Sequence, residues 1–244
     1  MTKIKVSIIT IVYNSEKTLE QTIISVINQT YKNIEYIIVD GKSKDGSIDI
    51  IKKYESKITK WISEPDNGIS DAFNKGVKLA SGDLIGIINS DDWYEPDAVE
   101  TVVENFSNQY DIYCGNLVLV DKNEVAFKIK PSVINRIYWG MYIMHPTTFI
   151  TKKAYDSVGQ FDIQLKIAMD YDIVLRLNKA KFRFKYINKS IANMRATGVS
   201  AQNVKGNNHE ILKVMKKYLP VHKFLFGYFF TKINSFRLKF IKIN

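Results

Sequence analysis

The hydrophobic residues of this chain gather in short runs, separated by segments with helical spacing. The β-rich segment 5–12 and the segment 34–39 predict strands, the second of them buried. The continuous run 84–88, of apolar or small residues, fits a buried central strand better than a half-exposed one. Strands that alternate with helices predict an α/β fold with a parallel sheet and right-handed crossovers. The first helix that we expect in this half is N-capped by Asn14 or Ser15 and has its apolar positions between Leu19 and Ile27. Further helices are expected over 47–54, 69–79 and 97–106.

The second half begins with a hairpin pattern. Two alternating segments, 112–120 and 124–129, flank Asp121-Lys122-Asn123, which is a turn signal. Apolar residues at helical spacing follow Asp170. The chain has 244 residues, of which 45% are hydrophobic, so it can form one large α/β domain with a C-terminal extension.

Acidic residues stand where two of the buried strands end. Asp40 follows the second strand, and Asn89-Ser90-Asp91-Asp92 follows the run 84–88. The carboxyl ends of parallel strands share one edge of the sheet, where ligands bind. Two adjacent carboxylates resist joint ionisation, and Mg²⁺ or Mn²⁺ with substrate phosphates would remove that cost. The alternative is an acidic turn that caps the next helix.

Two common nucleotide-binding motifs are missing from the sequence. No Gly-x-Gly-x-x-Gly follows the first strand, and no Gly-Lys-Ser/Thr loop occurs. These absences argue against a nicotinamide dinucleotide and a P-loop phosphate site. A nucleotide would then be held in another way, for which a metal on its phosphates is the simplest.

Cysteine usage and hydropathy indicate the compartment. Cys114 is the only cysteine, so no internal disulfide can form and a reducing compartment is expected. Residues 1–6 contain no secretory segment, and no apolar run reaches the roughly 18 residues of a membrane-spanning helix. We therefore expect a cytoplasmic protein.

The net charge of +10 is unevenly distributed. Residues 1–120 carry 12 Lys and 18 acidic residues, a balance of −6, whereas residues 121–244 carry 23 Lys and Arg and 7 acidic residues, a balance of +16. The basic half suits an anionic partner such as lipid headgroups, phosphorylated acceptors or nucleic acid. A solvated basic face is the alternative.

The tail 221–244 combines five Lys and Arg with many aromatic residues and has no acid. This composition predicts an amphipathic helix on an anionic membrane surface, at the inner face of the cell membrane. The alternatives are packing on its own domain or on a second subunit, which would make a homodimer.

Five segments occur in an order typical of one family. The chain resembles the family-two glycosyltransferases of the GT-A fold, in the bacterial surface-polysaccharide branch, over about residues 4–200. The segments that carry the resemblance are Ile9-Thr10-Ile11-Val12-Tyr13-Asn14, Ser25-Val26-Ile27-Asn28-Gln29-Thr30-Tyr31, Ile38-Val39-Asp40-Gly41-Lys42-Ser43-Lys44-Asp45-Gly46-Ser47, Asp66-Asn67-Gly68-Ile69-Ser70-Asp71-Ala72-Phe73-Asn74-Lys75-Gly76 and Asn89-Ser90-Asp91-Asp92.

The resemblance implies a metal-dependent, inverting hexosyltransferase that uses a nucleotide-sugar, usually a UDP-sugar, with Mg²⁺ or Mn²⁺. It implies a mixed, mainly parallel sheet flanked by helices. We expect a GT-A domain over 1–205, with a nucleotide-sugar half (1–120) and an acceptor half (121–205), and a basic amphipathic helical extension over 206–244. The acceptor would be a glycan or a lipid-linked saccharide of the bacterial surface.

The resemblance also assigns roles to individual residues. Asp92 would hold the metal and Asp91 the metal, ribose or sugar; this chain has Ser-Asp-Asp where other members have Asp-x-Asp, so the division between the two stays open. Asp40 would accept a hydrogen bond from uracil. The other residues expected to bind the nucleotide-sugar are Thr10, Val12, Tyr13, Asn14, Ser43, Asp66, Gly68, Asp71 and Lys75.

The acceptor half supplies the expected base. Asp170 lies in a segment that resembles the family's Glu-Asp motif, with Met169 in place of Glu, and an inverting displacement needs one base on the acceptor hydroxyl. The alternative for Asp170 is a helix N-cap. His145 and Arg195 would lie near the acceptor or diphosphate, and 195–202 would form a loop that closes over the diphosphate.

Two other classes of protein remain open at this point. A sugar-phosphate nucleotidyltransferase has a similar sheet but should show a Gly-rich basic loop after the first strand, where Thr10–Ser15 has none. A non-catalytic nucleic-acid binder would explain the basic half but gives the acidic residues no role, so we expect no nucleic-acid partner.

Overall fold

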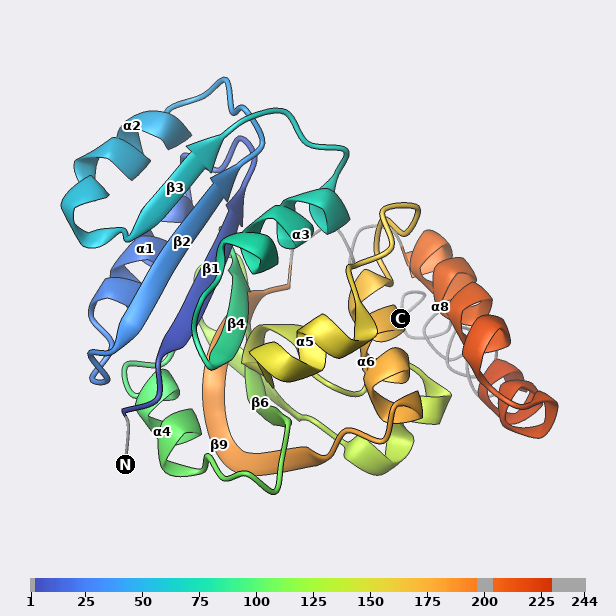
Figure 1. The fold of residues 1–244 in the computed structure, drawn as a ribbon. Coiled ribbons are helices and arrows are strands. Elements are labelled where there is room, and N and C mark those ends of the chain that lie inside the picture. Colours follow the sequence, from blue (N-terminus) through green and yellow to red (C-terminus); the bar gives the residue numbers. More distant parts are fainter. Residues whose placement is uncertain (1–2, 197–203, 230–244) are drawn as a thin grey trace.

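A mixed sheet forms the centre of the molecule (Figure 1). The computed structural model describes residues 3–196 and 204–229. The strand order is β3-β2-β1-β4-β8-β6-β9-β5, with β7 paired to β6. Strands β3, β2, β1 and β4 run parallel, whereas β8 is antiparallel to both β4 and β6. This mixed, mainly parallel sheet flanked by helices confirms the predicted fold class.

The nucleotide half has the predicted alternation of strands and helices. Continuous apolar strands are buried on both faces, and the amphipathic segments between them become crossover helices. The elements are β1 (Val6–Val12), α1 (Leu19–Ile27), β2 (Ile34–Asp40), α2 (Ser47–Lys53), η1 (Glu55–Lys57), β3 (Lys60–Ser63), α3 (Ile69–Leu79), β4 (Leu84–Asn89), β5 (Asp92–Tyr94) and α4 (Ala98–Glu104).

The acceptor half begins with the predicted hairpin, which joins β6 to β7 in antiparallel register. Its last strand, β9, is long and runs parallel to β6 before it reaches β5. The elements are β6 (Ile112–Val120), β7 (Ala126–Pro131), η2 (Ile134–Trp139), η3 (His145–Thr147), β8 (Phe149–Thr151), α5 (Lys152–Val158), α6 (Met169–Lys179), β9 (Phe184–Arg195) and α8 (Val204–Tyr218).

Two apolar cores lie on the two faces of the sheet. Alternate residues of the strands point to opposite faces, so Ile8 of β1 packs with α1, α2 and α4, whereas Ile9 packs with α3, α5 and α6. The side chains of both residues are fully buried. Because each face is covered, the ends of the strands are the open part of the sheet, and polar residues there are available to ligands.

The C-terminal helix α8 packs beside α6 (Figure 1). Its residues Val214 and Met215 are buried in the same apolar cluster as Ile173 and Leu177 of α6. The extension expected from residue 206 therefore begins as a helix that shares the core of the preceding part. A further helical segment covers 221–229, and the remainder of the predicted tail, 230–244, lies outside the described residues.

Candidate active site

Three neighbouring parallel strands end at one edge of the sheet. In the register of these strands, Val12 of β1 pairs with Asp40 of β2, and Ile11 pairs with Asn89 of β4. The sequence places polar and acidic residues directly after each of these positions. The structure thus brings the Tyr13–Ser15, Asp40–Ser43 and Asn89–Asp92 segments to the edge where α/β sheets bind ligands.

Asp40 is fully buried at the end of β2. Its carboxylate accepts hydrogen bonds from the Ser43 hydroxyl at 2.5 Å, the Ser43 N–H at 3.1 Å and the Ser63 hydroxyl at 2.7 Å. Ser63 was not among the sequence candidates. Its position could have indicated this contact, because Ser63 ends β3 and pairs with Asp40 in the parallel register. The three donors hold the carboxylate in one orientation.

Tyr13 and Asp66 flank Gly41, the residue after Asp40. A Cβ atom at Gly41 would lie 2.3 Å from Asp66 Oδ2 and 3.3 Å from Tyr13 Cδ2. The Tyr13 side chain is 63% exposed, so its ring is open to solvent on this side. Asn14 has a φ of 49° and accepts a hydrogen bond from the Lys44 N–H at 2.8 Å. These contacts join the loops after β1, β2 and β3 into one wall.

The turn before α3 carries the next group of candidates. Asp66 accepts a hydrogen bond from the Gly68 N–H at 2.9 Å, and Gly68 has a φ of 103°, which favours glycine. Lys75 pairs with Glu64 at 3.0 Å and with Asp71 at 3.7 Å. Burial opposes the charge on Lys75, but these carboxylates outweigh that effect and raise its pKa. The turn is therefore a fixed, mixed-charge surface.

Thr10 and Val12 lie away from this surface. Thr10 is fully buried in β1 and shares a hydrogen bond of 3.1 Å with the Tyr36 hydroxyl, and Val12 is 2% exposed. The two side chains point to the same face of the sheet, toward α1. Ile11, between them, points to the opposite face and is partly exposed. The side chains of Thr10 and Val12 are therefore not accessible to a base. The alternation of side chains along a strand could have identified Ile11 as the accessible residue from the sequence alone.

Asp91 and Asp92 form the acidic corner between β4 and β5. Asp92 is 1% exposed and its Oδ1 has no hydrogen-bond partner. Burial raises the pKa of Asp92 well above its usual range, and the adjacent Asp91 charge adds to the effect. Burial also raises the pKa of Asp91, against the opposing charge of Arg195. Two carboxylates are thus held in an environment that disfavours their ionised forms.

Arg195 at the end of β9 reaches this corner. Its guanidinium donates hydrogen bonds to the main-chain oxygen of Asp91 and to Gln21, and it pairs with Glu124 at 2.5 Å. The group lies 4.7 Å from the centroid of the Trp93 ring. The structure thus places Arg195 at the end of β9, beside the acidic residues, and positions 197–202 of the expected loop lie outside the described residues. Sequence reasoning missed Gln21, Trp93 and Glu124, which lack a family motif.

The acidic corner offers donors that a hard divalent cation takes. Asp92 Oδ1 and Asn89 Oδ1 are buried oxygens without a partner, and Asp91 supplies another carboxylate. Across residues 3–196 and 204–229 no group of three or more His, Cys, Asp or Glu residues could hold a metal ion. A cation at this corner would therefore need substrate oxygens to complete its coordination, which is the usual arrangement for Mg²⁺ on a diphosphate.

His145 and Asp170 line the same small cavity, of about 10 Å³. The remaining walls are largely apolar, and they include Tyr155 and Phe161. Burial lowers the pKa of His145 to about 4, so its imidazole is neutral at pH 7. Burial, with a smaller contribution from the charge of Glu210, raises the pKa of Asp170 to about 6, against the lowering effect of the hydrogen bond from the Tyr171 N–H. Asp170 is therefore a carboxylate whose proton affinity is close to neutrality.

Asp170 is not the N-cap residue of α6, although its carboxylate bonds to the start of the helix. Helix α6 begins at Met169, its N-cap residue is Ala168, and no side chain of that residue caps it. Asp170 lies inside the first turn and accepts a hydrogen bond from the Tyr171 N–H at 2.7 Å. Its side chain is thus directed at the cavity wall near the helix start.

Helix α3 links the nucleotide half to the start of α6. The Ser70 hydroxyl donates to the main-chain oxygen of Leu165 at 2.8 Å, and Asn74 exchanges two hydrogen bonds with Phe161, at 2.7 and 3.0 Å. Phe73 stacks on His145 with ring centroids 5.2 Å apart. The helix that follows the Asp66–Gly68 turn is therefore bonded to the segment that carries Asp170.

The comparisons with known proteins agree with this arrangement. The family described as glycosyl transferase family 2 matches residues 7–175. Chondroitin synthase of Escherichia coli is 28% identical over 219 residues, which are 84% of this chain and 31% of that protein. The chain therefore spans about a third of the length of this relative.

Two solved structures share the fold. S. aureus TarS 1–349 in complex with UDP-GlcNAc has a TM-score of 0.69 at 19% identity, and the match covers 88% of this chain and 65% of that chain. The mannosyltransferase PcManGT from Pyrobaculum calidifontis, in complex with GDP-Man and Mn²⁺, has a TM-score of 0.70 at 15% identity, over 89% of this chain and 64% of that one.

The mixed sheet, the acidic corner and the matched segment together define a glycosyltransferase of the GT-A fold. The chain belongs to glycosyl transferase family 2. This assignment confirms the predicted family and favours sugar transfer over nucleotidyl transfer and over a non-catalytic binding role.

Proposed function

We propose that this protein is an inverting, metal-dependent hexosyltransferase that moves a sugar from a UDP-sugar to a glycan or lipid-linked saccharide of the bacterial surface. The observation that carries the proposal is the acidic corner, where Asp92 has a buried oxygen without a partner and Arg195 lies beside Asp91. The UDP-GlcNAc complex of TarS supports a nucleotide-sugar donor, and the Mn²⁺ in PcManGT supports a divalent metal.

The donor would lie along the carboxyl edge of the sheet. Tyr13 and Ile11 offer apolar surface to a base, and Asp40 accepts hydrogen bonds at the end of β2. The Ser43 and Ser63 hydroxyls already donate to the Asp40 carboxylate, so a uracil N–H would have to donate to the same carboxylate. In the other arrangement, Asp40 would hold the loop after β2 in place and would not contact the base. Asp91 and Asp92 would hold Mg²⁺ or Mn²⁺, which supplies Lewis-acid stabilisation of the departing diphosphate.

Asp170 would act as the base on the acceptor hydroxyl. As the C–O bond to the acceptor forms, the hydroxyl proton passes to a carboxylate oxygen of Asp170, and the bond from the sugar to the diphosphate breaks on the opposite face. The neutral His145 in the same cavity can accept or donate one hydrogen bond there. Arg195 adds positive charge close to the leaving diphosphate.

Calorimetric titration of UDP tests the donor class, with GDP as control and each nucleotide measured with and without Mn²⁺. We expect UDP to bind only with Mn²⁺ and Asp92→Ala to lose this binding. Asp170→Asn should retain it, because Asp170 contacts the acceptor and not the donor. Binding of GDP in place of UDP would change the donor class, and binding of neither nucleotide would overturn the proposal.

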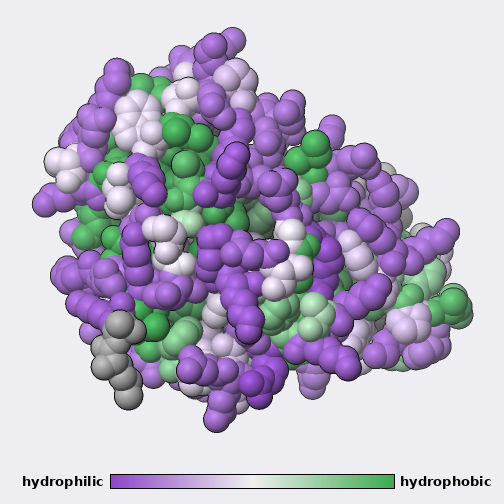
Figure 2. Space-filling view, in the orientation of Figure 1, coloured by the Kyte–Doolittle hydropathy of each residue, from purple (hydrophilic) through white to green (hydrophobic). Residues whose placement is uncertain are grey.

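The C-terminal helices give the proposal its membrane component. Val221, Leu225, Phe226 and Phe229 are between 47% and 74% exposed in the helical segment 221–229, and their spacing places them along one side of it. Hydrophobic side chains show at the right edge of the molecule in Figure 2, where the C-terminal helices lie. Phe226 contacts the Trp139 ring, with centroids 5.4 Å apart, but the group remains largely exposed. Exposed apolar groups of this kind often mark an interaction site.

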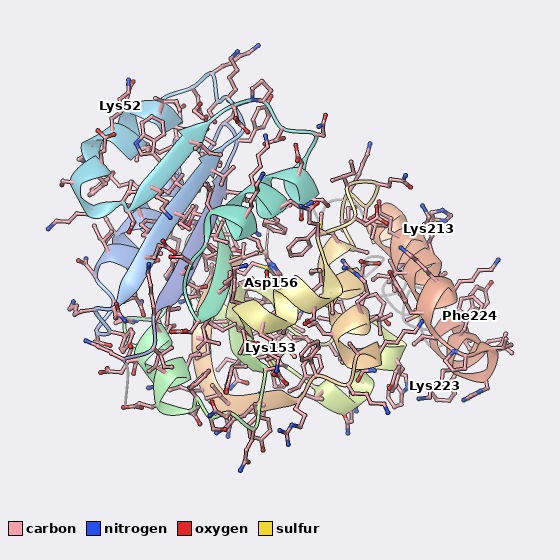
Figure 3. The ribbon with its side chains drawn as sticks, in the orientation of Figure 1. Lys52, Lys153, Asp156, Lys213, Lys223 and Phe224 are labelled. Atoms are coloured by element: carbon pink, nitrogen blue, oxygen red, sulfur yellow. The ribbon has the colours of Figure 1, made fainter. Side chains whose placement is uncertain are left out.

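Basic residues accompany this apolar group. Lys213 projects from α8 (Figure 3), and Lys216 and Lys217 are exposed on the same helix. Lys223 instead lies over the Tyr138 ring, 3.8 Å from its centroid. Apolar and basic groups together fit the surface of an anionic membrane, where a peripheral enzyme meets a lipid-linked acceptor. No helix within residues 3–196 and 204–229 is long and apolar enough to cross a bilayer.

Sedimentation with liposomes tests the membrane component. We expect binding to vesicles that contain anionic lipid, and a loss of binding when the chain is truncated after Leu219 or carries Phe226→Ser and Phe229→Ser. Vesicles of zwitterionic lipid alone are the control for charge. Unchanged binding after truncation would exclude this surface, and a concentration-dependent dimer that the two serine substitutions dissociate would assign it to a second subunit.

A further inference from the structure

A carboxylate from the C-terminal helix is bonded to the turn that enters α6. Glu210 of α8 accepts hydrogen bonds from three consecutive main-chain N–H groups: Lys166 at 3.1 Å, Ile167 at 2.8 Å and Ala168 at 3.0 Å. Charge-assisted hydrogen bonds of this kind are stronger than neutral ones. Glu210 therefore holds, from a distant part of the chain, the residues that immediately precede Met169 and Asp170.

Helix α6 has no capping hydrogen bond from the side chain of its own N-cap residue. The N-cap residue Ala168 has no side-chain oxygen, and the first residue of the helix, Met169, has none either. Val214 and Met215, one turn beyond Glu210 on α8, are buried against the cluster that contains α6. Helix α8 is thus fixed in place by its own core residues, so the position of the Glu210 carboxylate is determined by the fold.

We propose that Glu210 is a positioning residue of the transfer reaction, which fixes the turn that presents Asp170 and faces it with a negative charge. This inference rests on the proposed role of Asp170 as the base. It makes α8 a part of the catalytic unit, although the sequence assigns α8 to the extension. Glu210 touches neither substrate nor the reacting atoms in this role.

The charges around Asp170 agree with this role. Burial is the main cause of the raised pKa of Asp170, and the Glu210 charge raises it further. The hydrogen bonds from the turn lower the pKa of Glu210 itself, although burial acts against them. Among the described residues, the other titratable groups around these two include Lys213 and His209 on α8, His145 of η3, Tyr155 of α5, Lys166 in the turn, and Asp172 on α6 with its partners Arg176 and Lys217.

Carbon-13 NMR of the aspartate carboxyl groups tests the inference without any substrate. Asp170→Asn identifies the signal of Asp170 in a pH titration of the full chain. We expect Glu210→Gln to shift the midpoint of that signal to lower pH by a small part of the rise that burial causes, because a negative charge near the carboxylate is removed. We also expect amide hydrogen exchange at residues 166–168 to become about tenfold faster. Glu104→Gln, an exposed carboxamide substitution on α4, is the control and should change neither readout.

Activity then separates a positioning role from a purely structural one. With a donor that the UDP titration supports, Glu210→Gln should lower kcat about tenfold and leave the KM for donor unchanged, and Glu210→Asp should recover part of the loss. An unchanged midpoint and unchanged amide exchange in Glu210→Gln would overturn the inference. If that variant does not fold, the same readouts on Glu210→Asp decide, since this variant should show the faster exchange. A wild-type chain with no transferase activity would instead count against the proposed function.

Discussion

Arg195 donates a hydrogen bond to the main-chain oxygen of Asp91, a residue 104 positions earlier in the chain. The bond joins the end of β9, in the acceptor half, to the corner between β4 and β5, in the nucleotide half. The same guanidinium contacts Gln21, Glu124 and the ring of Trp93. The acidic corner is therefore assembled from segments far apart in sequence, and the Arg195 guanidinium supplies a positive charge to it.

Replacement of Arg195 should weaken nucleotide binding. Arg195→Gln removes the positive charge that opposes the burial of Asp91, so the corner becomes a poorer site for two ionised carboxylates. We expect the affinity for UDP with Mn²⁺ to fall about tenfold, which is about 1.4 kcal/mol. Calorimetric titration measures the change. Arg183→Gln alters an exposed arginine before β9 and should leave the affinity unchanged.

Asp92 should cost stability when no metal is bound. The pKa of Asp92 is higher in the folded state than in the unfolded state. The folded protein is therefore more stable at low pH, where Asp92 is protonated, and this stability is lost as the pH rises through the folded pKa. Asp92→Asn removes this loss at pH 8. Without metal, we expect the variant to gain about 1 kcal/mol in free energy of unfolding and to melt about 2–4 °C above the wild type. Thermal unfolding at pH 8 and pH 4 measures the difference, which should shrink at pH 4.

Metal and UDP should make the wild type melt at a higher temperature than Asp92→Asn. Mn²⁺ with UDP should raise the melting temperature of the wild type, because ligands that bind only the folded state stabilise it, but not that of Asp92→Asn. Asp49→Asn, at an exposed position on α2, controls for the loss of one charge. A variant that melts below the wild type without metal would show that the Asp92 carboxylate is stabilised by contacts other than those described here.

Most of the fold could be predicted because its signals are local. The runs 5–12, 34–39 and 84–88 became β1, β2 and β4, and the helix expected over 69–79 is α3. The helix expected over 97–106 is shorter, Ala98–Glu104. The position of β9 between β6 and β5 was not predictable, since it depends on pairings between residues far apart in the chain.

The candidate site was predictable where a residue ends a strand or belongs to a motif. Asp40, Asp91 and Asp92 are of this kind, and the structure places them at one edge. Thr10 belongs to a motif, but its side chain points into the core on the α1 face of the sheet and not toward the ligand-binding edge. The alternation of side chains along a strand decides this direction. Glu210 belongs to no motif, and only the packing of α8 brings it to α6.

A side chain at Gly41 should displace Asp66. An added Cβ would lie 2.3 Å from Asp66 Oδ2, so Gly41→Ala must displace the Asp66 carboxylate and the turn that it caps at Gly68. We expect UDP affinity to fall about tenfold with little loss of stability, because the displaced group is at the surface. Gly46→Ala is the control: its Cβ would meet the flexible end of Glu16 at 3.1 Å. Equal affinities of the two variants would remove Asp66 from the proposed donor site.

The pH dependence of transfer should report Asp170. Because burial and Glu210 raise its pKa to about 6, Asp170 is a carboxylate able to accept a proton above that pH, and it is protonated and inactive below it. We expect kcat to be level at pH 7 to 8 and to fall about tenfold per unit below about pH 6. A pH–rate profile at saturating donor and acceptor measures this limb.

Two variants connect this limb to Asp170 and not to its neighbour. Asp170→Asn should lower kcat by about 10² to 10⁴ at every pH while UDP binding persists. His145→Gln should retain the acid limb, since the pKa of His145, at about 4, lies below the range in which the rate changes. If His145→Gln abolishes the limb and Asp170→Asn retains activity, the base is the imidazole and the assignment passes from α6 to η3.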